Sequence, residues 1–181
     1  MINESARKAL ELDEEDHECH RILCETSLIW HKFDEAHYHS ARGLALNPND
    51  PRLVLQRSYL LAYTGKAEQA IEWAERALKL DPVGPKKYNA TLGFVLHDAK
   101  RYGEAINVMK RLSRPRAYGH AYLASAHAHL DQLDQAKAHA AQLLALKPGL
   151  TISGYVSSLR YGDSEAQEHL LDGLRKAGLP R

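Results

Sequence analysis

The sequence has no strong excess of either charge and no long apolar segment. Lys and Arg number 24 against 23 Asp and Glu, and the resulting net charge of +1 gives no global electrostatic case for binding nucleic acid or a membrane surface. No apolar run approaches the ~18 to 20 residues that a membrane span needs, and no signal peptide precedes the first predicted helix. The chain is therefore expected to be soluble and cytoplasmic.

Cysteines and aromatic residues are scarce. Cys19 and Cys24 are the only two cysteines. They lie on one predicted helix and point in different directions, so no disulfide is expected between them, which fits a reducing compartment. Aromatic residues make up 7% of the chain, and Ala and Leu supply most of the 44% that is hydrophobic. This composition favours helices packed closely through small side chains.

The charges are unevenly distributed along the chain. Residues 1–50 carry 5 Lys or Arg and 11 Asp or Glu, whereas residues 51–117 carry 13 and 6. An acidic end and a basic middle could orient a partner or a second copy of the chain. Solvated outer helix faces of differing sign explain the same counts without a partner.

A repeat of about 34 residues organises most of the chain, and its clearest copy runs from Asn49 to Pro82. Each copy reads as a helix, a tight turn, a second helix and a stop. The alanine that opens each second helix recurs at spacings of 34, 35 and 31 residues, as Ala36, Ala70, Ala105 and Ala136. Such helix pairs bury their apolar faces only by stacking on neighbours, which predicts a solenoid.

These residues resemble the tetratricopeptide repeat (TPR) family, in which a Leu precedes a small residue in the first helix and a Pro closes the repeat. The matching positions are Leu23–Cys24, Leu92–Gly93, Leu123–Ala124, Pro48, Pro82 and Pro148. The second copy departs, with Arg57 and Ser58 at the first pair. The resemblance implies an all-α fold, an α-solenoid of helix-turn-helix repeats with a C-terminal capping helix.

The predicted boundaries follow the repeat. The four copies are expected at 17–50, 51–84, 85–116 and 117–148, the third with a shortened second helix that ends near Arg114. Residues 1–16 read as the second helix of a repeat that lacks its first helix, so the chain is expected to be a fragment of a longer protein. Residues 149–181 are expected to form capping helices.

Local signals mark individual turns and helix ends. Asp50 before Pro51 predicts a helix N-cap with proline at the first helical position. Gly65 is expected at the turn between two helices with a positive φ. Ser164 with Gln167 predicts a capping box at the start of the last helix.

The last residues carry a narrower resemblance. The ending LLDGLRKAGLP, directly after repeats, is similar to the C-terminal repeat regions of bacterial class III adenylate cyclase proteins and of some winged-helix regulators. This implies that the chain is the regulatory or assembly region of a larger signalling protein. Neither effector domain is present in the sequence, so neither activity is assigned to it.

The sequence offers little chemistry. His17, Cys19, His20 and Cys24 are the strongest candidate metal ligands, because His20 and Cys24 share a helix face. Cys24 also falls on the small position that packs a helix pair, which explains it without a metal. No Ser or Cys has a base and an orienting group at a useful spacing. We therefore predict no enzyme activity, no cofactor and no catalytic or metal-binding residues.

Function is instead expected on the concave surface, which the first helix of each repeat lines in this family. Carrying the inward positions of the repeat onto this sequence predicts a groove that binds a protein or peptide segment. Its predicted residues are Arg21, Arg52, Gln56, Tyr59, Tyr63, Lys87, Phe94, His97, Tyr118, Tyr122 and His129. Tyr and Phe give large contact areas, and Arg52 and Lys87 could hold an acidic or C-terminal group.

Two alternatives accompany this interpretation. The first is self-association, because Ile2, Ala6 and Leu10 are expected to lack their usual cover at the N-terminal end and a dimer would bury them. The second is a role within a winged-helix transcription regulator. The family's grip on a chaperone's terminal carboxylate is not expected, because Glu25 and Thr91 stand where that grip needs Asn and Arg.

Overall fold

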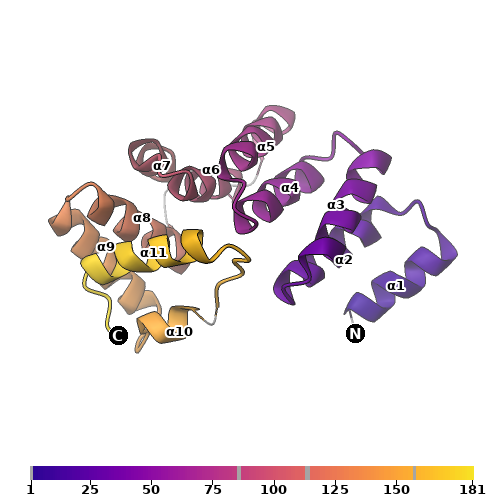
Figure 1. Cartoon of the computed structure of the whole chain (residues 1–181). Coiled ribbons are helices and arrows are strands. Elements are labelled where there is room, and N and C mark those ends of the chain that lie inside the picture. Colours follow the sequence, from indigo (N-terminus) through magenta and orange to yellow (C-terminus); the bar gives the residue numbers. More distant parts are fainter. Residues whose placement is uncertain (1, 85–86, 113–114, 157) are drawn as a thin grey trace.

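The chain folds into a curved array of helices, as a computed structural model shows (Figure 1). The structure describes residues 2–84, 87–112, 115–156 and 158–181, except for the side chains of residues 2, 3 and 87. All regular structure within these residues is helical, which confirms the predicted fold class. The helices are α1 (Ile2–Leu12), α2 (His17–Ile29), α3 (Phe33–Leu46), α4 (Pro51–Tyr63), α5 (Ala67–Leu80), α6 (Lys87–Asp98), α7 (Tyr102–Met109), α8 (Ala117–His129), α9 (Leu133–Leu146), α10 (Ile152–Val156) and α11 (Ser164–Lys176).

Consecutive helices pack in pairs, α2 with α3, α4 with α5, α6 with α7 and α8 with α9. The second helix of each pair begins close to an alanine that is almost fully buried, and these are Ala36, Ala70, Ala105 and Ala136. A methyl side chain at this position lets the two helices approach closely, and larger residues fill the grooves on either side. The periodic alanines of the sequence therefore mark the contacts that hold each pair together.

The turn inside each pair has one recurring geometry. His31, Gly65, Lys100 and Asp131 have positive φ values of 54°, 77°, 62° and 56°. The next residue donates its backbone N–H to a carbonyl five positions earlier, as Lys66 does to Leu61 at 2.8 Å. This is the Schellman motif, which satisfies the last carbonyls of a helix. The predicted positive φ of Gly65 is confirmed, and the other three turns adopt the same conformation without glycine.

Helix ends confirm one predicted cap and correct another. Asp50 caps α4 by accepting from the N–H of Arg52, with Pro51 at the first helical position, as predicted. The capping box predicted at Ser164 is wrong, because the N-cap of α11 is Asp163, whose carboxylate accepts from the N–H of Glu165. Both residues suit the role, and the chain enters the helix one residue earlier than the pattern indicated.

The third pair is shortened in its second helix, as predicted. The α7 helix has 8 residues, whereas α5 and α9 each have 14. It ends at Met109, before the end predicted near Arg114, which lies outside the described residues.

At the N-terminal end, α1 packs against α2. Ala6 is buried there, so the expectation that this residue lacks cover is wrong: the neighbouring helices already cover it. Leu10 is half-buried, and the side chain of Ile2 lies outside the described residues.

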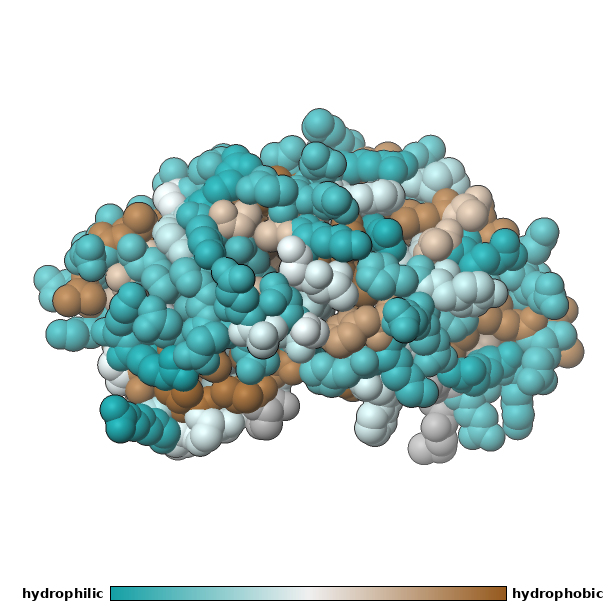
Figure 2. All heavy atoms as spheres, viewed as in Figure 1, coloured by the Kyte–Doolittle hydropathy of each residue, from teal (hydrophilic) through white to brown (hydrophobic). Residues whose placement is uncertain are grey.

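The C-terminal segment turns back along the array (Figure 1, orange to yellow). Helix α11 packs mainly against α8, the first helix of the last pair, and touches α9 much less. The contact is close at Gly173, where a Cβ would lie 2.1 Å from Ser125 Oγ. The largest apolar cluster accordingly extends from α4 to residues beyond α11. We call residues 150–181 the tail. Figure 2 shows mainly hydrophilic residues on this face of the molecule, with hydrophobic ones gathered below the C-terminal half.

Candidate functional site

A pocket of about 840 Å³ lies between the first helices of the pairs and the tail. Helices α2, α4, α6 and α8 form one side, and α10 with the residues after it forms the other. The lining residues include Arg21, Glu25, Arg52, Gln56, Tyr59, Tyr63, Phe94, Arg116, Tyr118, Tyr122, Lys147, Tyr155, Ser158, Leu159 and Arg160. The tail therefore converts an open groove into a partly enclosed pocket.

A row of aromatic rings forms the floor of this pocket. Tyr59 and Phe94 stack with their centroids 5.8 Å apart, and Tyr63 lies 5.4 Å from Phe94. Tyr122 continues the row in a T-shaped contact with Phe94, with the ring centroids 5.2 Å apart. Contacts of this geometry stabilise aromatic pairs beyond their area burial. Phe94 and Tyr122 are only 3% and 5% exposed, so they support the floor more than they offer contact area.

Tyr161 extends the aromatic row from the tail. Its ring meets Tyr63 edge-on at 5.3 Å, and its hydroxyl lies 2.9 Å from that of Tyr122. The same hydroxyl donates to both carboxyl oxygens of Asp98 at 2.8 Å. The tail is thus anchored by a buried tyrosine whose polar end is satisfied, as burial of a hydroxyl requires.

The tail also uses its backbone. The N–H groups of Gly162 and Asp163 both donate to the carbonyl of Tyr63, at 2.8 and 3.2 Å. This carbonyl belongs to the last turn of α4, where helix carbonyls lack partners within the helix. Gly162 also packs against the ring of Phe33, and a Cβ at Gly162 would lie 2.6 Å from that ring. Residues next to α11 therefore contact the first and second helix pairs, far from the tail in sequence.

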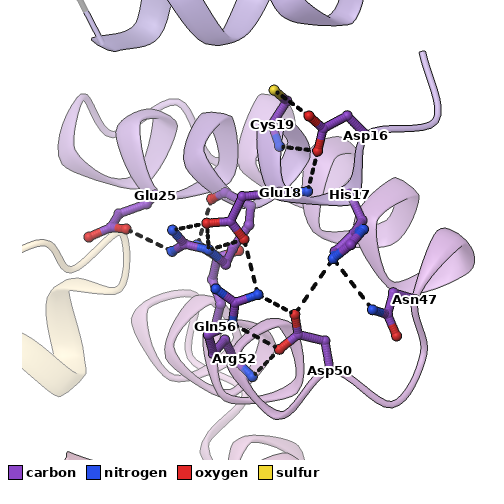
Figure 3. Close-up of polar contacts among 10 residues, drawn as sticks. Asp16, His17, Glu18, Cys19, Glu25, Asn47, Asp50, Arg52 and Gln56 are labelled. Atoms are coloured by element: carbon purple, nitrogen blue, oxygen red, sulfur yellow. Dashed lines mark hydrogen bonds and ion pairs between the residues drawn. The ribbon is translucent and has the colours of Figure 1, made fainter. Parts of the chain in front are cut away.

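The α2–α4 end of the pocket is a network of ion pairs (Figure 3). Arg21 binds Glu18 with N–O distances of 2.7 to 3.0 Å and Glu25 at 3.3 Å. Arg52 lies 2.8 Å from Asp50 and 3.3 Å from Glu18. The hydrogen bond from Arg21 lowers the pKa of Glu18. For Asp50, burial is the largest single effect and acts to raise the pKa, but several opposing effects, led by the hydrogen bond from Arg52, together outweigh it and lower the pKa. Both arginines predicted for the groove are therefore already matched by carboxylates.

Gln56 stands out beside this network. Its amide nitrogen donates to the carbonyl of Arg21 at 2.8 Å. Its Oε1 is buried and has no hydrogen-bond partner among the described residues. The residue lines the pocket and is 8% exposed. A buried acceptor without a partner costs about 1 to 3 kcal/mol, a cost that a ligand N–H would remove.

The structure brings most of the predicted groove residues together. Those that line the pocket are Arg21, Arg52, Gln56, Tyr59, Tyr63, Phe94, Tyr118 and Tyr122. His97 and His129 are not among its lining residues, because they point toward α11. The side chain of Lys87 lies outside the described residues.

His97 belongs to a buried polar network. Its Nε2 lies 2.8 Å from Ser125 Oγ and its Nδ1 lies 3.3 Å from Asp98 Oδ1. Burial lowers the pKa of His97 to about 3, with a smaller effect from His129. Burial also raises the pKa of Asp98 well above its ordinary value, although the hydrogen bond from Tyr161 opposes this. Two neutral groups are therefore expected here.

The Ser125–His97–Asp98 order is that of a nucleophile, a base and an orienting acid, an arrangement that spacing along the sequence did not reveal. Ser125 and His97 both have 0% exposure, and α11 covers Ser125. A substrate has no route to the hydroxyl in this conformation, so we assign the network a structural role.

Next to it, His129 stacks on His169 with centroids 4.1 Å apart, which fixes α11 against α8. Burial, followed by the effect of His129, lowers the pKa of His169 to about 4.

The candidate metal ligands separate in the structure. Cys24 is fully buried in the contact between helices, where burial raises the pKa of its thiol to about 12. His20 instead faces His39, with 2.9 Å between the two Nδ1 atoms. Within the residues that the structure describes, no group of three or more His, Cys, Asp or Glu side chains is placed to hold a metal ion.

Sequence reasoning missed many of the pocket residues, among them Arg116 and Lys147, and Ser158 and Arg160 from the tail. The repeat pattern lapses after Pro148, so no periodic position indicates that the tail faces the pocket.

None of the helices in the described part of the chain is long and apolar enough to cross a membrane.

Comparisons with known proteins support the family suggested by the repeat. Residues 51–83 match the tetratricopeptide repeat family. U-box domain-containing protein 70 of Oryza sativa subsp. japonica is 32% identical over 89 residues, which make up 47% of this chain and 11% of that protein. The chain thus spans about a tenth of the length of the curated relative that it matches.

Solved structures of similar shape include several TPR proteins. PilW, a type IV pilus biogenesis factor, is similar over 96% of this chain and 78% of its own, with a TM-score of 0.75 and 17% identity. YrrB, described as a TPR protein with an unusual peptide-binding site, is similar over 97% of this chain and 91% of its own, with a TM-score of 0.63 and 19% identity. A thermophilic TPR protein of Thermus thermophilus is similar over 94% of this chain and 87% of its own, with a TM-score of 0.68 and 18% identity. At these identities the likeness shows the fold, a TPR solenoid.

Proposed function

We propose that this chain is a protein interaction module that binds a short segment of another protein in the pocket between α4, α8 and the tail. TPR solenoids typically serve as protein-binding surfaces, which supports this class of function, although a fold alone does not assign one. The observation that carries the proposal is the pocket itself, an aromatic floor beside a buried acceptor, Gln56 Oε1, that has no partner within the described residues.

The tail limits the size of what binds. The pocket volume of about 840 Å³ falls in the range of ~300 to 1,000 Å³ typical of enclosed ligand sites. An amphipathic helix needs a long open groove, which the tail interrupts at Tyr161. A short extended segment or a chain end fits this space, with its backbone N–H donating to Gln56 and an apolar side chain on the rings of Tyr59 and Tyr63.

Binding without catalysis is part of the proposal. Its support is that the one Ser–His–Asp arrangement found among the described residues is closed to solvent by α11. The pocket is lined by rings, arginines and an amide, groups that suit recognition.

The cellular setting is also a proposal. A place in the regulatory region of a larger bacterial signalling protein in the cytoplasm, of the adenylate cyclase or winged-helix kind, rests on the resemblance of the tail sequence alone. Sequencing the gene upstream of the first codon tests it, because either effector domain would be recognisable there. Association through α1 likewise stays a prediction, and light scattering that finds a monomer at high concentration would contradict it.

Variants that test binding must leave the fold intact. Alanine at Tyr63, Phe94 and Tyr122 together would remove buried rings and unfold the chain, since each loss costs about 3 to 5 kcal/mol. Ser158 is exposed on the pocket wall, so Ser158→Trp fills the pocket from the surface. Tyr118 is 40% exposed in the pocket, and Tyr38, 59% exposed on α3 away from it, is its matched control.

The experiment is a selection from a random peptide library against the immobilised full chain. We expect a set of enriched peptides that Ser158→Trp and Tyr118→Ala lose and Tyr38→Ala retains. Circular dichroism confirms that each variant is folded. Enrichment that survives Ser158→Trp would place binding elsewhere, and no enrichment by the wild type would remove the proposed function.

A further inference from the structure

The charges along the pocket are not balanced from one end to the other. Its charged lining residues are Arg21, Glu25, Arg52, Arg116, Lys147 and Arg160. At the α2–α4 end, Arg21 and Arg52 share the carboxylates of Glu18, Glu25 and Asp50, so this end has no spare positive charge.

The α8–α10 end is different. Arg116 precedes α8, Lys147 follows α9, and Arg160 lies in the tail. Among the residues that the structure describes, no carboxylate lies within ion-pair distance of any of these three side chains. Glu25, the only acidic residue among the described ones that line the pocket, is on α2 and is paired with Arg21. The pocket lining therefore holds three cations that no carboxylate among the described residues neutralises, Arg116 and Lys147 next to α8 and α9, and Arg160 near Tyr59 and Tyr63 of α4.

Arg160 brings this positive charge to the aromatic floor. It is half-buried, and its charge acts to lower the pKa values of Tyr59 and Tyr63, which burial otherwise raises. A guanidinium close to rings, away from bulk water, binds a carboxylate more strongly than an exposed lysine does. Arg116 is next to Tyr118, whose exposed ring gives the same end a surface for an apolar neighbour of that carboxylate.

We propose that the pocket selects a protein segment that carries a carboxylate at one end, an acidic side chain or a C-terminal carboxylate, and holds that end over Arg116 and Lys147, with Arg160 adding positive charge above the aromatic floor. The rest of the segment runs toward α2, with a backbone N–H on Gln56 Oε1. This inference rests on the proposed function and adds to it the chemistry and the direction of the bound segment. It also reassigns the acid-binding role, because Arg52 is already paired with Asp50.

The test uses peptide arrays in which the same random core sequences carry one of four ends. These are an acidic residue with an amidated terminus, a neutral residue with a free carboxylate, a neutral residue with an amide, and a lysine with an amide. The first two separate the side chain from the terminus as the source of the carboxylate. The proteins are the full-length wild type, the double variant Arg116→Glu with Lys147→Glu, and the control Lys79→Glu with Lys137→Glu.

The control pair is matched in charge change, because Lys79 and Lys137 are exposed on α5 and α9 and do not line the pocket. We expect the wild type and the control to prefer at least one of the carboxylate-bearing sets over the neutral amide. The pocket variant should lose about tenfold or more in affinity for that set, and added salt should weaken its binding to the wild type.

Other results distinguish a failure of the inferred carboxylate preference from a failure of the proposed function. If all four sets bind equally and Ser158→Trp abolishes binding, the pocket binds peptides and the inferred preference is wrong. If no set binds, the proposed function fails with it. A single-stranded oligonucleotide that displaces the bound peptides and depends on Arg116 and Lys147 would also overturn the inference, because the cations would then serve a nucleic acid.

Discussion

The neutral pair of His97 and Asp98 makes a sharp prediction about stability and pH. Buried side by side, both groups are expected to be uncharged in the folded chain, whereas in the unfolded chain Asp98 ionises above about 3.8 and His97 takes up a proton below about 6.5. Between these values the unfolded pair holds one proton, on His97, and the folded pair also holds one, on Asp98. The two contributions to the pH slope of stability therefore cancel in the wild type.

A variant that lacks one of the two groups shows the pH dependence of stability that the other group contributes. In His97→Gln the folded state binds one proton more than the unfolded state, because the raised pKa keeps Asp98 protonated. Its contribution is present at low pH and is lost as the pH rises, so this variant should lose about 1.4 kcal/mol per pH unit relative to wild type. In Asp98→Asn only His97 remains, with a folded pKa of about 3. Its contribution is present above 6.5 and lost as the pH falls, which gives the opposite slope.

Urea unfolding followed by circular dichroism at several pH values from about 4 to about 6.5 measures these slopes. Other histidines with lowered pKa values, such as His169, add the same pH dependence of stability to all three proteins, so the difference from wild type isolates the pair. A His97→Gln variant whose stability relative to wild type does not change with pH would refute the reasoning, since removing His97 would then leave the proton balance unchanged, which requires a charged His97 in the fold.

Three further changes test the tail and the turns. Tyr161→Phe removes the hydroxyl that donates to Asp98, so urea unfolding should show a loss of about 1 to 3 kcal/mol, and no loss would mean that this hydrogen bond is not formed. Gly173→Val places side-chain atoms where Ser125 lies, so α11 should separate from α8 and become sensitive to trypsin, whereas unchanged protection would contradict the close contact. Asp131→Gly relieves a positive φ of 56° and should stabilise the chain by about 1 kcal/mol, seen as a higher urea midpoint, and a lower midpoint would show that the side chain compensates for the strain.

The sequence predicted the features that depend on neighbours along the chain. The helix pairs, the contacts at Ala70 and its equivalents, the cap at Asp50 and the turn at Gly65 all follow from local spacing and backbone preference. These signals recur in each copy of the repeat, so the prediction of the fold does not depend on any single copy. The row of pocket-lining rings from Tyr59 to Tyr122 followed from the same repeat positions.

The position of the tail could not be predicted in this way. Tyr161 meets Asp98 across 63 residues, and Gly162 meets a carbonyl about a hundred residues earlier. The tail does not continue the repeat that would set its register, and its capping signals were ambiguous even for the first residue of α11. Because the tail adds Arg160 to the pocket lining and places Tyr161 against Tyr63 and Tyr122, the pocket chemistry emerged only from the three-dimensional arrangement.

The hydrogen bonds from Gly162 and Asp163 to Tyr63 have a consequence for how the chain comes apart. A linear stack of repeats can fray from either end, because each unit depends only on its neighbours. Here the last segment is fastened to the second helix pair, so opening any pair between them must also strain or release that closure. Amides of α4 to α9 should then exchange with solvent together in a single cooperative step, and cutting the chain near residue 157 should let them exchange repeat by repeat.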